Sequence, residues 1–260
     1  MHERYYYRAG GWSRKNGPCP AYAGNVTDDA TPTRTGDGSY TLHSSRYGQT
    51  FHSHHGAVAE AKHVFLEGSG LLKRLAAGRP SLLLEVGFGT GLNCWLSADA
   101  AESAGAELEI ITLERDPLPA ETVRLLEYGQ HLQHPEILEA WLACRESLPR
   151  SVPAGRYSCT LSEHSHLTVL VGDATTQELP DGRADVIFHD AFSPEANPEL
   201  WTAQFLTALH EALKPGGTLV TYSVKGEVRR RLQAIGFTVT KRPGPAGGKR
   251  EMLTAHKDGN

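Results

Sequence analysis

The stretch Glu85-Val-Gly-Phe-Gly-Thr-Gly91 carries three glycines at alternate positions, directly after the apolar run 81–86. A short apolar run that ends in glycines is typical of a β-strand that turns sharply into a helix, here expected near residues 91–103. Glycine in such a turn lets backbone N–H groups approach a ligand closely, because no Cβ intervenes. An ordinary tight turn also fits these glycines, so the nature of any ligand depends on the rest of the chain.

Strand and helix patterns alternate regularly after this turn. Further strands are predicted at 108–113, 166–171, 184–188, 218–222, 237–240 and 251–255. Helices are predicted near 117–128, 135–148, 198–213 and 226–235. This alternation predicts a Rossmann-like α/β fold, with a mainly parallel seven-stranded sheet and an antiparallel C-terminal strand.

The sequence before the turn has a different character. Residues 1–39 are rich in Gly, Pro, Thr and Asp without a sustained period, so we expect a flexible N-terminal tail there. A short strand is predicted at Tyr40-Thr-Leu-His43, and helical spacing extends over residues 55–75. We therefore expect residues 40–80 to be an N-terminal extension that packs on a catalytic domain spanning residues 81–257.

Composition excludes several classes of protein. A net charge of −4 does not fit a protein that coats nucleic acid over its whole surface, although nine Lys and Arg residues against three Asp and Glu residues from Tyr222 onward leave room for a local basic face. No apolar run approaches the roughly 20 residues that span a bilayer, and the N-terminus has no signal-peptide pattern. The four cysteines are widely spaced, which argues against a disulfide framework or a thiolate zinc site and fits a reducing cytosol: Cys19, Cys94, Cys144 and Cys159. These features predict a cytoplasmic protein without membrane partners.

Three features downstream of the glycine turn indicate a nucleoside-bearing cofactor. Glu114 follows the second strand, where a carboxylate can accept hydrogen bonds from both ribose hydroxyls. Asp173 and Ala174 follow a later strand, where an acid or its neighbouring backbone can bind an adenine amino group. The breaker Lys214-Pro-Gly-Gly217 precedes another strand, as in many methyltransferases. Across residues 81–240 the chain resembles the class I methyltransferases.

NAD and S-adenosylmethionine both suit such a site. NAD requires its pyrophosphate at the helix N-terminus, usually with the spacing Gly-x-Gly-x-x-Gly, whereas this chain has Gly-x-Gly-x-Gly. Glu85 would repel a pyrophosphate and suit the ammonium and sulfonium of S-adenosylmethionine. The sequence therefore favours S-adenosylmethionine.

The loop from His189 to Trp201 follows a buried strand and should lie at the carboxyl edge of the sheet, where doubly wound folds bind ligands. Asp190 offers a carboxylate that can orient an amine and accept its proton. Phe192 offers a flat face for an adenine or an extruded base, and Trp201 either does the same or belongs to the core of a helix.

Several stretches together look like the methyltransferase half of the MnmC family, over roughly residues 40–255. They are the turn from Glu85 to Asn93, the Asp-x-Phe-Ser-Pro-x-x-Asn-Pro-x-x-Trp loop, the segment 237–244 with Gly248-Lys-Arg-Glu-Met-Leu253, and the segment 40–67. The resemblance implies methylation of the amine of 5-aminomethyluridine, with or without a 2-thio group, at the tRNA wobble position. Family members with two domains also carry an FAD-dependent oxidase half, which we expect this chain to lack, so that a separate enzyme supplies the aminomethyl precursor. Family members often have a lysine where this chain has Glu195 or Ala196, and a cationic contact is not expected there.

The candidate site follows from these patterns, with Asp190 as the catalytic residue. We expect the cofactor to contact Glu85, Gly87, Phe88, Gly89, Thr90, Gly91, Asn93, Glu114, Asp173, Ala174, Asp190 and Phe192. The anticodon loop of tRNA is expected to contact Ser193, Pro194, Asn197, Trp201, Lys225, Arg229, Lys249 and Arg250, with basic side chains binding phosphates. No metal is expected, since His52, His54 and His55 lack the helical or carboxylate spacing of a zinc site and fit the mouth of the active site better.

Two other readings fit the same residues. The chain can be a methyltransferase or aminopropyltransferase for another amine, on a small molecule or a protein. It can also be a non-catalytic RNA-binding module that kept the fold, against which the intact glycines, Glu114 and Asp190 argue.

Overall fold

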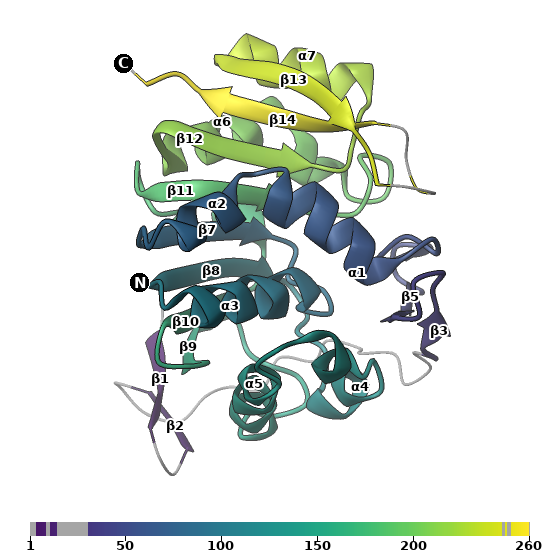
Figure 1. The fold of residues 1–260 in the computed structure, drawn as a ribbon, viewed down its shortest axis with the longest axis vertical. Coiled ribbons are helices and arrows are strands. Elements are labelled where there is room, and N and C mark those ends of the chain that lie inside the picture. Colours follow the sequence, from purple (N-terminus) through teal and green to yellow (C-terminus); the bar gives the residue numbers. More distant parts are fainter. Residues whose placement is uncertain (1–3, 9–10, 15–30, 246–247, 249–250, 260) are drawn as a thin grey trace.

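The computed structural model describes residues 4–8, 11–14, 31–245, 248 and 251–259. Its main element is a sheet with the strand order β13-β14-β12-β11-β7-β8-β10-β9-β1-β2 (Figure 1). The strands are β1 (Arg4–Arg8), β2 (Gly11–Arg14), β7 (Ser81–Val86), β8 (Leu108–Glu114), β9 (Gly155–Thr160), β10 (Ser165–Val171), β11 (Ala184–His189), β12 (Leu213–Thr221), β13 (Phe237–Pro243) and β14 (Glu251–Lys257).

The seven predicted strands are confirmed as one continuous block of this sheet. They are β7, β8, β10, β11, β12, β13 and β14, and the central pairs run parallel. The C-terminal strand β14 runs antiparallel to both of its neighbours, as predicted. Strands β7 and β11 are buried along their whole length, because helices cover both faces of the sheet.

Three further strands extend the sheet beyond β10. Strand β9 pairs antiparallel with β10, β1 pairs parallel with β9, and β2 pairs antiparallel with β1. No periodic pattern in the sequence indicates β9, because only Tyr157 and Cys159 of this strand are buried and its other residues are half-buried or exposed. Residues 1–39 were expected to form a flexible tail; β1 and β2 lie within this segment, whereas residues 15–30 lie outside the described part of the chain.

Helices cover the sheet in two layers. They are α1 (Ala57–Glu60), the π-helical η1 (Ala61–Glu67), α2 (Leu71–Ala76), α3 (Leu92–Ala104), α4 (Ala120–Arg124), α5 (Glu136–Glu146), α6 (Ala203–Ala212) and α7 (Gly226–Ile235), with 3-10 turns η2 (Tyr128–His131), η3 (Ala174–Thr176) and η4 (Pro198–Trp201). Figure 1 shows α1, α2 and α3 on the near face and α6 and α7 on the far face. Two hydrophobic clusters correspond to these layers.

The segment before the sheet packs against it. The ring of Phe65 in η1 lies 5.4 Å from the ring of Phe188 in β11. The predicted single helix over 55–75 is interrupted at Gly70, whose φ of +81° is left-handed and ends a regular helix. The predicted strand at 40–43 is not continuous. Its residues belong to two short hairpins, which are β3 (Thr33–Arg34) with β4 (Tyr40–Thr41) and β5 (His43–Ser44) with β6 (Gln49–Thr50).

The expectation that the cysteines form no disulfide is wrong for one pair. Cys144 in α5 and Cys159 in β9 are bonded, with their Cα atoms 6.5 Å apart. Their separation of 15 residues reveals nothing about this proximity, which arises because α5 packs on the unpredicted strand β9. Cys94 is a buried free thiol, and Cys19 lies outside the described residues.

No helix among the described residues is long and apolar enough to cross a membrane.

Candidate functional site

A cavity of about 740 Å³ lies at the carboxyl ends of the central strands. The turns that follow β7, β8 and β11 line it, and the hairpin β5–β6 borders it from the other side. In Figure 1, β3 and β5 lie on the side toward which the central strands point. This is the edge at which open α/β sheets bind ligands.

The glycine turn forms the floor of the cavity, and two of its glycines cannot be replaced by larger residues. Gly87 has a φ of +91°, and a Cβ there would lie 2.7 Å from the carbonyl oxygen of Asp190. Gly89 has a φ of +54°, and its Cβ would lie 2.9 Å from the ring of Phe51. The turn therefore keeps its backbone in close contact with two other loops, which only glycine permits.

Glu114 lies in the cavity wall at the end of β8. Its Oε2 accepts a hydrogen bond of 2.8 Å from the backbone N–H of Gly89, and its Oε1 accepts one of 2.9 Å from Asp116 N–H. Burial raises the pKa of Glu114, while these backbone hydrogen bonds oppose the rise. The acid predicted as a ribose partner is thus held directly beside the glycine turn.

Glu85 is not part of the cavity wall, in contrast to the role predicted for its carboxylate. Its side chain is fully buried under the turn, where Thr112 Oγ1 donates a hydrogen bond of 2.9 Å to Oε2. Burial raises the pKa of Glu85 to about 8 and outweighs the hydrogen bond from Thr112, which acts to lower it. The group is therefore largely neutral at pH 7, because burial penalises the charged form.

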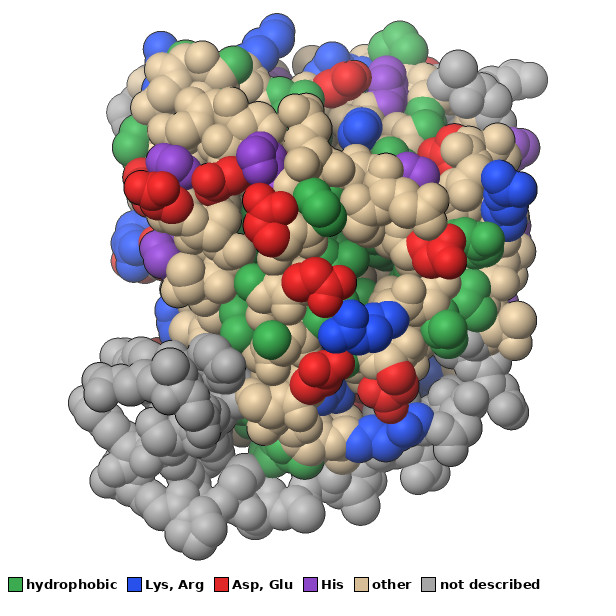
Figure 2. Space-filling view, turned by 60° about the horizontal axis from the view of Figure 1, so that its bottom comes forward, with side chains coloured by type: hydrophobic (Ala, Val, Ile, Leu, Met, Phe, Trp, Pro, Cys, Tyr) green, Lys and Arg blue, Asp and Glu red, His purple; other side chains and the backbone are tan. Residues whose placement is uncertain are grey.

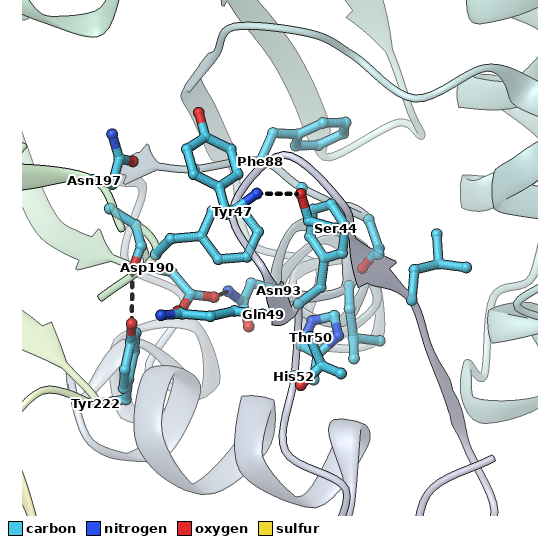
Figure 3. Close-up of a pocket in the computed structure, with 18 of the residues that line it drawn as sticks. Ser44, Tyr47, Gln49, Thr50, His52, Phe88, Asn93, Asp190, Asn197 and Tyr222 are labelled. Carbon is cyan, nitrogen blue, oxygen red and sulfur yellow. Dashed lines mark hydrogen bonds between the residues drawn. The ribbon is translucent and has the colours of Figure 1, made fainter. Parts of the chain in front are cut away.

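Asp190 lies in the cavity wall at the end of β11 and is held from two sides. Its backbone N–H donates to Val86 O at 2.9 Å, and Asn93 Nδ2 donates to its Oδ2 at 2.8 Å. Tyr222, which the sequence analysis did not single out, donates from its hydroxyl to Ala191 O at 2.9 Å. Figure 3 shows Asn93 and Tyr222 both directed toward the Asp190 segment. Burial raises the pKa of Tyr222, with further contributions from Asp190 and Glu60, so the phenol is neutral.

The loop after Asp190 carries an aromatic cluster. The ring of Phe192 stacks on Tyr47 with centroids 4.3 Å apart and meets the edge of Phe51 at 5.2 Å. Ser193 forms two hydrogen bonds with Gln49, and Asn197 lies in the cavity wall, donating to Glu199 at 2.6 Å. Pro194 is not among the residues that line the cavity.

Of the other predicted cofactor residues, Phe88, Thr90 and Ala174 line the cavity, whereas Asp173 does not. Asp173 is exposed and accepts a hydrogen bond of 2.9 Å from Thr175 N–H, which makes it the N-cap of η3. Its neighbour Ala174 lines the cavity, as does Thr90, whose hydroxyl accepts from Tyr128 at 3.2 Å. The ring of Phe88 packs against two core tryptophans, Trp95 and Trp141.

Trp201 belongs to the core and is not available for stacking on a base. It is 1% exposed, and its ring lies 4.2 Å from that of His189. Its Nε1 donates a hydrogen bond of 2.8 Å to Phe192 O. The sequence left both readings open, and the structure selects the helix-core reading because η4 turns this side chain inward.

Lys225 and Arg229, the predicted basic residues within the described part of the chain, do not form an open cationic surface. Lys225 contacts Glu195 as an ion pair, and Arg229 is half-buried on α7. Lys249 and Arg250 lie outside the described residues. On the face shown in Figure 2, acidic and basic side chains are interspersed and neither sign forms a broad patch.

The hairpin β5–β6 and the residues after it supply cavity residues that the sequence analysis did not single out, namely Arg46, Tyr47, Gln49 and Phe51. His52, His54 and His55 line the cavity, as expected for its mouth, and burial lowers the pKa of His52 to about 4. The only signal for this hairpin was the family resemblance of the segment 40–67, because a short polar hairpin has no periodicity of its own.

The chain is similar in sequence to known S-adenosylmethionine-dependent methyltransferases. A family model described as S-adenosyl-L-methionine-dependent methyltransferase matches residues 135–258. The tRNA 5-methylaminomethyl-2-thiouridine biosynthesis bifunctional protein MnmC of Aromatoleum aromaticum is 36% identical over 239 residues, which are 89% of this chain and 35% of that protein. The protein of the same name from Chromohalobacter salexigens is 36% identical over 230 residues, covering 85% of this chain and 32% of that protein.

A solved structure is similar to this chain over most of the length of both. The crystal structure of MNMC2 from Aquifex aeolicus superimposes with a TM-score of 0.69 at 31% sequence identity, covering 88% of this chain and 71% of that one. The curated relatives are longer, and the chain spans about a third of their length.

Proposed function

Because the chain belongs to the MnmC2 family of S-adenosylmethionine-dependent methyltransferases, we propose that it methylates a tRNA wobble uridine. The acceptor is the primary amine of 5-aminomethyluridine, with or without a 2-thio group. The observation that carries this proposal is the 36% identity to bifunctional MnmC proteins over 89% of the chain. The cavity supports it, since two of the segments that carry the resemblance, residues 40–67 and the Asp190 loop, both line it.

The chemistry of the cavity fits S-adenosylmethionine. This cofactor supplies an electrophilic methyl group on a sulfonium and presents hydrogen-bond donors, namely an ammonium and two ribose hydroxyls. Acceptors suited to these donors are the carboxylate of Glu114 and Asn93 Oδ1, a buried oxygen without a hydrogen-bond donor in the described part of the chain. Gly87 and Gly89 would hold the methionine and ribose portions, and the backbone at Ala174 would bind the adenine.

Asp190 would orient the acceptor amine and take up its proton. Methyl transfer needs an in-line approach and a neutral amine, so positioning and proton removal are the tasks left to the protein. Asn93 Nδ2 fixes the orientation of the Asp190 carboxylate through its hydrogen bond of 2.8 Å. Tyr222 fixes the next residue by donating to Ala191 O. Phe192 provides an aromatic face suited to the uracil ring.

The remaining parts of the proposal follow from the substrate. The partner is the anticodon loop of a tRNA, contacted by Ser193, Asn197, Lys225 and the basic residues near the C-terminus. A tRNA substrate implies the cytoplasm, and an aminomethyl precursor implies an enzymatic step that generates it, within a longer polypeptide or on a separate one. We also propose that residues 40–257 act as one catalytic unit, because the extension and the sheet share the cavity.

The test is mass spectrometry of wobble nucleosides after incubation with aminomethyl-bearing tRNA and cofactor labelled in its methyl group. We expect label on the wobble uridine. Label on another tRNA nucleoside would overturn the assigned position, and a labelled small molecule or protein in a mixed extract, with no labelled tRNA, would transfer the proposal to another amine.

Replacing Asp190 by alanine tests its role. We expect Asp190→Ala to lower kcat by about 100-fold or more, in the range usual for a lost general base, while the Kd for the cofactor changes by less than about threefold. The exposed Asp181→Ala serves as the matched control and should leave both constants unchanged. Equal losses in kcat and cofactor affinity would contradict a catalytic role.

A further inference from the structure

Side chains of the hairpin β5–β6 contact two loops that line opposite parts of the cavity. The guanidinium of Arg46 forms an ion pair with Asp116, just after β8. Gln49 contacts Ser193, which follows β11 and lies 144 residues further along the chain. The hairpin thus holds the loop that carries Glu114 and the loop that carries Asp190 in one arrangement.

The contact between Gln49 and Ser193 is reciprocal. Gln49 Nε2 donates to Ser193 Oγ at 2.7 Å, and Ser193 N–H donates to Gln49 Oε1 at 3.3 Å. One side-chain amide therefore binds both the side chain and the backbone of the same residue. Such a pair fixes the distance and the rotation of the loop, which a single hydrogen bond does not.

Aromatic contacts support the same attachment. Tyr47 stacks on Phe192 at 4.3 Å, and the edge of Phe51 meets it at 5.2 Å. Phe51 also contacts the glycine turn, since its ring leaves no room for a Cβ at Gly89. The hairpin and the residue after it thus pack against both the floor of the cavity and the loop that follows Asp190. Figure 3 shows Tyr47 and Gln49 of the hairpin near Asp190.

Three consecutive residues after Asp190 are each held by a side chain from a different element. Tyr222 after β12 binds Ala191 O, Trp201 in η4 binds Phe192 O, and Gln49 in β6 binds Ser193. The first two come from the sheet and its connections, whereas Gln49 comes from the N-terminal extension. Without Gln49 the peptide N–H and the hydroxyl of Ser193 would each lose the hydrogen bond that joins them to the hairpin, and the loop would be held less firmly at this residue.

We propose that Gln49 is a positioning residue for methyl transfer. By binding both the side chain and the backbone of Ser193, it holds the Asp190–Phe192 segment over the glycine turn. The kinetic consequence rests on the proposed tRNA methylation. The physical consequence, an ordered loop, does not. Because Gln49 acts through Asp190 and Phe192, its loss lowers the fraction of molecules in the productive geometry and leaves the cofactor contacts in place.

The kinetic experiment compares Gln49→Leu with Gln49→Glu in the full chain. Leucine keeps the approximate volume and removes both hydrogen bonds, so we expect kcat to fall about tenfold with the KM for cofactor unchanged. Glutamate can accept from both Ser193 N–H and Ser193 O–H, so we expect it to restore most of the lost kcat. The exposed Gln233→Leu on α7 is the matched control.

A double-mutant cycle with Ser193→Ala separates positioning from a general loss of structure. If the two residues act through one contact, the double variant should be little worse than Gln49→Leu alone. Additive losses, an unchanged kcat in Gln49→Leu, or failure of Gln49→Glu to recover activity would each overturn the proposal.

A second measurement does not depend on the substrate. Hydrogen exchange of the peptides covering residues 190–197 should be faster in Gln49→Leu than in the parent protein, while peptides from β7 remain unchanged. Equal exchange in the two proteins would overturn the positioning role even if tRNA is methylated. Faster exchange in a protein that does not methylate tRNA would support the role of Gln49 and overturn the proposed function instead.

Discussion

The carboxyl group of Glu85 lies in the interior, fully out of contact with solvent, and receives one hydrogen bond of 2.9 Å from Thr112. Its other oxygen has no hydrogen-bond donor in the described part of the chain. A charged carboxylate in such a place is costly, so the proton stays on and the pKa rises from an ordinary 4.5 to about 8. The residue therefore supports the turn from below as a neutral acid.

A pH dependence of stability follows at this residue. Between pH 4.5 and pH 8 the folded protein holds a proton on Glu85 that the unfolded chain releases, so stability falls as the pH rises through this window. Glu85→Gln, which cannot ionise, should lose less stability than the parent, by up to about 3.5 kcal/mol between pH 5 and pH 8. Urea unfolding of both proteins at the two pH values measures this difference. Parallel pH profiles would contradict a raised pKa.

At the scale of elements, the contact between α5 and β9 combines an ordinary packing surface with a covalent link. Cys144 and Cys159 join the two elements, and Tyr157 of β9 belongs to the same hydrophobic cluster as both cysteines. Strand β9 lies near the edge of the sheet, where β1 pairs with it on one side and β10 on the other. The disulfide attaches this part of the sheet to the helix that covers it.

Reduction of the disulfide should weaken the fold without abolishing it. Opening a loop of 15 residues returns conformational freedom to the unfolded chain, for which we expect a loss of about 3 kcal/mol in the free energy of unfolding. Urea unfolding with and without reductant measures it, and the Cys144→Ser/Cys159→Ser double variant should be insensitive to reductant. Thiol titration of the denatured protein should find two fewer thiols before reduction than after it; equal numbers would contradict the disulfide.

At the scale of the whole molecule, charge limits how tRNA is bound. The net charge is −4, and basic residues near the cavity contact acids: Arg46 with Asp116, Arg115 with Glu199, and Lys225 with Glu195. A phosphate would have to displace these acids to reach the cations. The described part of the chain therefore favours a few local phosphate contacts over a broad electrostatic surface.

This charge pattern predicts a shallow salt dependence of tRNA binding. Three or four phosphate contacts in a single-stranded loop correspond to a slope of about −2 to −3 in log K against log salt concentration. Lys225→Ala should reduce the slope by about 0.7, whereas the exposed Lys73→Ala on α2 should not change it. A flat dependence would argue against any phosphate contact, and a slope steeper than about −6 would indicate binding through a broad basic surface.

The sequence by itself determined the seven-stranded core, the order of its elements and the place of the ligand edge. Apolar runs such as Ser81–Val86, together with the glycines that follow, contain this information locally, because buried strands need continuous apolar residues and a tight turn needs positive φ. Glu114 and Asp190 were found for the same reason, since each directly follows such a strand. The cofactor class followed from these local patterns and the family resemblance.

Only the tertiary structure decided which side chains face the cavity and which support it. Glu85 and Trp201 are turned into the core, Asp173 caps a helix, and Gln49 reaches Ser193 from 144 residues away. The disulfide and strand β9 belong with these, because they depend on elements that meet only after the chain has folded. Local pattern specifies an element and its ends, whereas the direction of a single side chain and its distant partner are set by packing, which no sequence spacing records.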